Sequence, residues 1–261
     1  MSRVFRKLQL SPQANRIISY IFYALFALLI IYNIVNTDKT SYKIMYLILL
    51  IVILGFALYS EFLKHLYEKA IKQLAYDCNP KQATQTFDFL MTKDFAHAYR
   101  NSRILFDTLC AMDELNIETT KRLLATNDKF FHSTLDQLLI YHYSQFFIAF
   151  LTNDEATGKI EYQKIIRMKE SKVKGMKVSP LFNWDQLDGM YQFMRQDIKQ
   201  SINLLKKVDT TYMNPREMVQ YHAICVGIGT KAKDISFTQS HLKQLNQING
   251  TSLIATKGIN L

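Results

Sequence analysis

Residues 44–62 read IMYLILLIVILGFALYSEF, and their only charge, Glu61, stands next to the end. Residues 17–35 read IISYIFYALFALLIIYNIV and carry no charge. As a helix, each stretch of 19 residues spans about 28 Å, which matches the hydrocarbon core of a bilayer at roughly 30 Å. Both are too evenly apolar for surface helices, because the outer face of such a helix must be polar. We therefore predict two transmembrane helices, joined by residues 36–43 as a tight antiparallel hairpin.

The positive charges around these segments predict how the hairpin is oriented. Two lie in the connector, Lys39 and Lys43, and seven lie outside the segments: Arg3, Arg6, Lys7, Arg16, Lys64, Lys69 and Lys72. Lys and Arg concentrate on the cytoplasmic side of membrane proteins, so we expect both termini in the cytoplasm. Residues 1–63 would form an anchor, since neither segment has the mid-membrane ionisable residue of an ion path. A signal peptide at 17–35 and a buried core hairpin are the alternatives.

The composition narrows the class of protein. The chain has 261 residues and a formal net charge of +10, which is compatible with an acidic partner, a nucleic acid or a membrane surface. The three Cys residues lie far apart without a CxxC pair, which excludes a disulfide framework and a Cys-rich zinc module. The abundance of Lys, Ile, Asn and Tyr is typical of an AT-rich bacterial genome. The expected location is therefore a bacterial cytoplasmic membrane.

From residue 64 to about residue 248, apolar residues recur at spacings of three and four, which is typical of amphipathic helices. Bulky apolar residues recur late in each of five candidate hairpins: 64–92, 94–126, 134–169, 181–208 and 215–248. We predict an all-α chain in which the two-span hairpin is followed by an α-solenoid-like array of about five helix pairs, residues 64–248. An irregular helical bundle is the alternative. Residues 249–261 are expected to form a flexible C-terminal tail.

The fourth of these hairpins carries a local motif. Trp184, Leu187 and Tyr191 have the spacing W-x2-L-x3-Y, and Leu204 follows as a large apolar residue. This stretch resembles the first helix of a tetratricopeptide (TPR) repeat, in which the stripe faces the second helix of the same repeat. The chain departs from the family pattern at three positions: Asp188, Gln200 and Pro215. The resemblance implies a degenerate TPR-like domain that binds other proteins.

Two sets of residues are candidate contacts with partners. The side of the fourth hairpin's first helix that lies away from the stripe would line a groove, with Phe182, Asp185, Gly189, Gln192 and Phe193. A groove with two Phe beside polar groups is suited to bind an amphipathic segment of another protein. The alternative, equally compatible with the sequence, is that Phe182 and Phe193 pack against a neighbouring repeat.

The second set lies in the basic stretch 159–177, which has seven positive and two negative charges. Its candidates for contact with anionic lipid headgroups or an acidic partner are Lys169, Lys172, Lys174 and Lys177. A solvated loop is the alternative.

No motif for catalysis or cofactor binding emerges. Asp128, His132 and Asp136 share one helix face, but no further ligand converges on them, and a solvated face explains them. His142 lies in an apolar helix, as core histidines do. Residues 227–231, GIGTK, lack the spacing of a phosphate loop. We interpret their glycines either as sites where two helices approach or as the turn of the fifth hairpin. We expect no catalytic residue, cofactor or metal, and no nucleic-acid partner, since no recognised motif accompanies the charge.

These features favour a membrane-tethered cytoplasmic adaptor that binds another protein in a bacterial envelope, secretion or signalling assembly. The tether would raise the effective concentration of a partner at the same membrane. The alternative is an accessory subunit of a membrane transporter or secretion channel, in which the transmembrane hairpin makes the contact. A third class, an enzyme on a helical scaffold, would require a pocket that holds His132 or His142 beside carboxylates.

Overall fold

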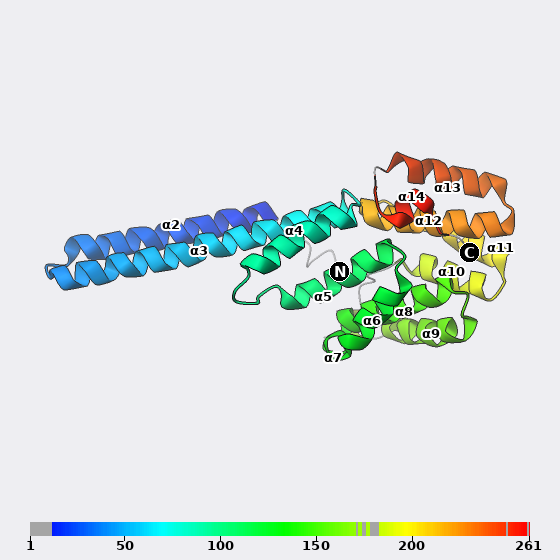
Figure 1. The fold of residues 1–261 in the computed structure, drawn as a ribbon, viewed down its shortest axis with the longest axis horizontal. Coiled ribbons are helices and arrows are strands. Elements are labelled where there is room, and N and C mark those ends of the chain that lie inside the picture. Colours follow the sequence, from blue (N-terminus) through cyan, green and yellow to red (C-terminus); the bar gives the residue numbers. More distant parts are fainter. Residues whose placement is uncertain (1–11, 171, 174–175, 178–182, 249, 260) are drawn as a thin grey trace. The chain divides into compact units, whose positions relative to one another are not determined.

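The computed structural model describes residues 12–261 apart from 171, 174–175, 178–182, 249 and 260, with side chains from residue 20 on outside 170–182 (Figure 1). Apart from turns and two very short strands, the described residues are helical, and the all-α prediction is confirmed. The chain divides into two units, of which the first ends at Leu66 and the second begins at Tyr67.

The first unit contains α2, Pro12–Asn36, and most of α3, Thr40–Ala75. Most of their described apolar side chains are exposed. Among the described residues, α3 alone is long and apolar enough to cross a membrane, and the described apolar part of α2, Tyr20–Asn36, is shorter. The two stretches that we predicted as spans, 17–35 and 44–62, lie within α2 and α3, so both are helical.

Helix α3 does not end where its apolar stretch ends. It continues to Ala75, through the boundary after residue 63 that we expected between anchor and helical domain. Residues 56–75 contain neither Gly nor Pro, so nothing in the local sequence stops the helix. Its last turns are amphipathic, because Ala70 and Leu74 are buried while Lys72 is exposed.

The second unit is built from helices that pack in sequential pairs. After α4 (Pro80–Lys93) the pairs are α5 (Arg100–Asp113) with α6 (Ile117–Thr126), α8 (Leu135–Leu151) with α9 (Glu155–Glu170), α10 (Trp184–Met194) with α11 (Ile198–Leu205), and α12 (Pro215–Ala232) with α13 (Ile235–Gln247). The remaining helices, α7 (Asp128–Phe131) and α14 (Leu253–Lys257), are short. Helix pairs were predicted in these regions, and their existence is confirmed.

One turn recurs between α3 and α4 and inside each pair. Its first residue has a positive φ, and this residue is Cys78, Leu115, Asn153, Gln196 or Lys233. The next residue is always Asn or Asp, and its side chain accepts a hydrogen bond from the N–H three residues later: Asn79, Asn116, Asp154, Asp197 and Asp234. A left-handed residue ends a helix, and Asn or Asp is a favoured N-cap of the next. The same local solution therefore turns the chain in all five hairpins.

In the second unit, called the helical unit below, hydrogen bonds also join helices that are not neighbours along the chain. Arg216 at the start of α12 donates two hydrogen bonds, of 2.6 and 2.8 Å, to the buried carboxylate of Asp113 at the end of α5. The N–H groups of Thr251 and Ser252 donate to the carbonyl oxygen of Cys78, at 3.1 and 3.2 Å. In an open solenoid each repeat contacts only its neighbours. These bonds join parts that are distant along the chain, in addition to the sequential packing of the helix pairs.

The C-terminal residues take part in these contacts. Within the segment that we expected to be a flexible tail, Leu253–Lys257 form α14, and Ile254 and Ile259 are buried. A Cβ on Gly227 would lie 2.7 Å from the carbonyl oxygen of Ile259, and only glycine leaves room for the C-terminal segment against α12. A Cβ on Gly229 would likewise lie 2.6 Å from an atom of α13. The approach of two helices is confirmed at Gly229, whereas Gly227 makes room for the C-terminal segment.

The TPR-like stripe packs differently from the expectation. Leu187 is fully buried, whereas Trp184 and Tyr191 are half-buried. Tyr191 stacks on Tyr162 of α9 with ring centroids 3.9 Å apart, and Nζ of Lys169 lies 5.1 Å from the ring centroid of Trp184. Trp184 and Tyr191 therefore contact the preceding pair, which corrects the expectation that the stripe faces α11.

Candidate binding site

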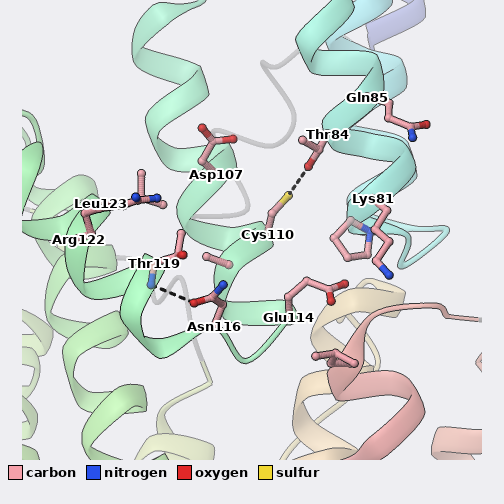
Figure 2. A pocket seen from close by; sticks show the side chains of 13 residues that line it. Lys81, Thr84, Gln85, Asp107, Cys110, Glu114, Asn116, Thr119, Arg122 and Leu123 are labelled. Atoms are coloured by element: carbon pink, nitrogen blue, oxygen red, sulfur yellow. Dashed lines mark hydrogen bonds between the residues drawn. The ribbon is translucent and has the colours of Figure 1, made fainter.

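A pocket of about 680 Å³ opens between α4, α5 and α6, and Leu253 of α14 also lines it (Figure 2). It lies beside the place where Thr251 and Ser252 donate hydrogen bonds to Cys78. Its volume is in the range of pockets that hold a small molecule or a few side chains of a peptide.

The least exposed part of the lining is small and apolar. Cys110 and Ala111 of α5 are buried, and Leu123 of α6 lies beside them. The hydroxyl of Thr84 on α4 donates a hydrogen bond to the sulfur of Cys110 at 3.8 Å, as Figure 2 shows. Burial raises the pKa of the Cys110 thiol to about 12. The thiol is therefore in its neutral form near pH 7.

Charged side chains of both signs surround this apolar part. Lys81 of α4 and Arg122 of α6 are exposed, whereas Asp107 and Glu114 of the α5 region are half-buried. Nε of Arg103 donates a 2.7 Å hydrogen bond to Asp107, so this carboxylate is already paired within the protein. Glu114 differs, because its Oε1 is buried and has no hydrogen-bond partner among the described residues.

Glu114 is therefore the acceptor that a ligand could use. Burial raises the pKa of its carboxyl group, and the positive charge of Lys81 opposes this effect. A buried acceptor without a partner is unfavourable, because it has lost water and gained no bond. An ammonium, guanidinium or amide N–H that entered the pocket would satisfy it. Acidic groups of the same ligand could pair with Lys81 or Arg122 at the rim.

Two of the predicted groove residues on α10 lie in packing positions. Gly189 is buried, and a Cβ added there would lie 2.9 Å from Cγ of Leu205 on α11. Phe193 is half-buried, and its ring centroid lies 5.8 Å from that of Phe150 on α8. Neither residue lines the pocket of Figure 2.

For the other predicted contact residues, the structure describes fewer contacts. Asp185 and Gln192 are half-buried, and Phe182 lies outside the described residues. In the basic set, Lys169 covers Trp184, while Lys172 and Lys177 face each other across two antiparallel strands, β1 (Lys172–Val173) and β2 (Met176–Lys177). The side chains of this strand pair and the whole of Lys174 are outside the described part. Both contact surfaces stay predictions.

The two histidines considered in the sequence analysis, His132 and His142, have partners inside the protein. Nδ1 of His142 lies 2.6 Å from Oε2 of Glu161 on α9, and Lys164 donates to the other oxygen of Glu161 at 2.8 Å. Burial alone would raise the pKa of Glu161, but the hydrogen bonds from His142 and Lys164 outweigh it and lower that pKa. Nδ1 of His132 lies 3.3 Å from Oδ1 of Asp128 on the surface. Neither histidine lines the pocket, and no group of three potential metal ligands occurs in the described part of the chain.

Comparison with protein-family models, with curated proteins and with solved structures found no match for this chain. The site was also not predicted from sequence. The signal that could have indicated it is the recurrent turn: Lys81 lies two residues after the cap Asn79, and Glu114 lies two residues before the cap Asn116. A search for Asn or Asp at the repeat period would have identified both turns as equivalent positions of neighbouring repeats.

Proposed function

We propose that this protein is an adaptor anchored in a bacterial cytoplasmic membrane, and that its helical unit holds a segment of another protein. Residues 17–35 and 44–62 would cross the membrane, with both termini in the cytoplasm. The exposed apolar surface of α3 supports the anchor, because a helix that is apolar all round is normally covered by protein or by lipid. The recurrent turn supports a repeat-built domain of TPR-like character, a class of architecture that presents binding surfaces.

The observation that carries the binding proposal is the pocket between α4, α5 and α6 with the unsatisfied Oε1 of Glu114. The segment would place a Lys or Arg side chain on Glu114 and an apolar neighbour over Cys110 and Leu123. Interfaces of this kind combine a buried anchor with charged groups at the rim. A nucleic acid fits less well, because its phosphates would meet the carboxylates of Asp107 and Glu114.

Site-specific photo-crosslinking in native membranes tests the proposal. A photoreactive residue at Gln85, which is exposed and lines the pocket, should capture the partner in the full-length protein. The matched control is Gln239 on α13, which is also exposed and should give no adduct. Equal adducts at both positions would contradict the pocket. Adducts from Leu58 in the apolar stretch, without any from position 85, would favour the accessory subunit that acts through its transmembrane hairpin.

A second variant tests the chemistry of the site. Glu114→Gln should reduce the crosslinking yield from position 85 about ten-fold, since a hydrogen bond to a charged group contributes about 1.5–3 kcal/mol. Glu118→Gln, on the exposed side of the neighbouring helix, is the control and should leave the yield unchanged. An unchanged yield in Glu114→Gln would remove this carboxylate from the site.

A further inference from the structure

The loop that joins α4 to α5, together with the helix ends beside it, presents aromatic rings beside positive charges. Phe95 is 67% exposed and Phe89 is 47% exposed. Nζ of Lys93 lies 5.4 Å from the ring centroid of Phe89, and Arg100 at the start of α5 is exposed. These four residues, Phe89, Lys93, Phe95 and Arg100, are called the loop patch below. It is separate from the pocket, which none of them lines.

The single acidic residue of the loop is bonded to the backbone of the loop itself. The buried carboxylate of Asp94 accepts hydrogen bonds from the N–H groups of Ala98 and Tyr99, at 3.1 and 2.8 Å. The only negative charge between residues 93 and 100 is therefore directed into the loop. The charges left at its surface are positive, and Phe95 is presented on an ordered backbone.

The loop also contacts a residue that closely follows the apolar stretch along the chain. The ring centroid of Tyr99 is 5.1 Å from that of Tyr67. Tyr67 follows Phe62, the last residue of the predicted span, by five residues. Five residues reach at most about 18 Å even when fully extended. If residues 44–62 cross the membrane, Tyr67 must remain within that distance of the hydrocarbon boundary, where the headgroup layer adds roughly 5–8 Å.

We propose that the loop patch docks on the anionic surface of the same membrane that anchors the protein. The two Phe rings would enter the interface, and Lys93 and Arg100 would pair with lipid phosphates. Aromatic rings are favoured at this depth, and basic residues are attracted by anionic lipids. The inference rests on the proposed membrane anchor, and it adds a second attachment point that belongs to the helical unit.

The test uses the full-length protein reconstituted in vesicles, with a bimane label and quencher lipids that carry a spin label near the headgroup. The three native Cys residues are buried, and protein without an introduced Cys gives the labelling blank. Labels are placed in three variants: Phe95→Cys in the loop patch, Ile235→Cys on exposed α13, and Leu58→Cys in the apolar stretch. With phosphatidylglycerol present, the label at 95 should be quenched at least twice as strongly as the label at 235. No other protein is present, so a protein partner cannot produce this result.

The outcomes separate the inference from the anchor on which it rests. Quenching at 58 and 95, but not at 235, supports both. Quenching at 58 with equal values at 95 and 235 overturns the docking and leaves the anchor intact. The absence of quenching at both 58 and 95 overturns the anchor and the docking together. Strong quenching at 95 with no quenching at 58 contradicts the anchor alone and supports the contact of the loop patch with lipid.

Charge dependence provides a second readout. Quenching at 95 should be at least two-fold weaker in vesicles of neutral phosphatidylcholine than in anionic vesicles. Lys93→Gln combined with Arg100→Gln should remove this difference, whereas the matched pair Lys243→Gln and Lys257→Gln, at exposed positions elsewhere, should retain it. Equal quenching in neutral and anionic vesicles would overturn the proposal that the patch recognises an anionic surface.

Discussion

Residues 44–62 of α3 and helix α8 are both rich in apolar residues, and they end in opposite environments. Residues 44–62 of α3 keep most of their apolar side chains exposed, whereas α8 buries its aromatic residues Tyr143, Phe146, Phe147 and Phe150. An evenly apolar helix has no face that favours water, so it must be covered on all sides. For α8 the cover is protein, since α6, α9 and α10 pack around it. For α3 we propose that the cover is lipid.

The difference between the two helices lies in length and in polar side chains. Helix α8 has 17 residues, or about 26 Å, which is shorter than the hydrocarbon core. It also contains His142 and Ser144, whose buried polar atoms need partners and find them in Glu161 and in the carbonyl oxygen of Ile140. Residues 44–58 contain neither a charged side chain nor a histidine. Polar groups inside an apolar helix therefore mark the helix that packs within protein.

The largest effect is expected where the helical unit depends on an internal partner. Arg216→Met would leave the carboxylate of Asp113 buried without its cation, at a cost of about 3–5 kcal/mol in the free energy of unfolding. Urea unfolding of the detergent-solubilised protein, followed by circular dichroism, measures this. The double variant Asp113→Leu with Arg216→Met should regain most of the loss, because a buried ion pair can often be replaced by apolar residues. If the double variant is as unstable as the single one, apolar residues cannot replace the ion pair of Asp113 and Arg216.

A smaller effect is expected from a charge in the apolar stretch of α3. Ile51→Lys should disfavour membrane insertion by about 2.5–3.5 kcal/mol. The readout is labelling of Ser41→Cys, in the predicted outer connector, by a membrane-impermeant thiol reagent on intact cells. Ile51 is 63% exposed, and the control Ile235→Lys changes an isoleucine that is 71% exposed on the helical unit. The label should be lost in the first variant and kept in the second. Labelling at a C-terminal Cys instead of position 41 would invert the proposed orientation.

The contact between neighbouring helix pairs should contribute less. The stacked rings of Tyr162 and Tyr191 join α9 to α10, and an aromatic pair contributes about 0.5–1.5 kcal/mol beyond its buried area. A double-mutant cycle with Tyr162→Leu and Tyr191→Leu measures this coupling from unfolding curves. A coupling near zero would mean that the pairs are held together by other contacts, and that the TPR-like stripe is not part of their interface.

The effect that is smallest at neutral pH concerns a buried histidine pair and grows as the pH falls. Nδ1 of His222 lies 2.8 Å from Nδ1 of His241, and burial, together with the charge of His241, lowers the pKa of His222 to about 4. An unfolded histidine has a pKa of about 6.5. Between these values the unfolded chain binds more protons, so the contribution of His222 to stability falls as pH decreases from about 6.5 to about 4. His222→Gln should flatten the loss of melting temperature in this window, whereas exposed His97→Gln should not. An equally steep loss in His222→Gln would assign the pH dependence to other groups.

The helix pairs could be predicted because their signals are local. Apolar spacing, Pro80 and Pro215 at helix starts, and breakers between segments all act within one or two turns. The recurrent turn was also readable, since its Asn or Asp caps recur at 79, 116, 154, 197 and 234. Bulky apolar pairs were a weaker guide to the same period, because many positions in a helical core accept them.

The sequence alone therefore established a helical chain, its division into an evenly apolar beginning and an amphipathic remainder, and most helix ends. Each of these follows from hydrogen bonds and side-chain contacts between residues a few positions apart. The contact of Asp113 with Arg216, the burial of Ile254 and Ile259, and the pocket with Glu114 became visible only in the tertiary structure. The ion pair of Asp113 and Arg216 joins residues 103 positions apart, and the hydrogen bonds of Thr251 and Ser252 reach back to Cys78. No local pattern tells which distant side chain will supply the partner of a buried charge. That choice is made by packing, which brings α14 and α12 back to the beginning of the helical unit.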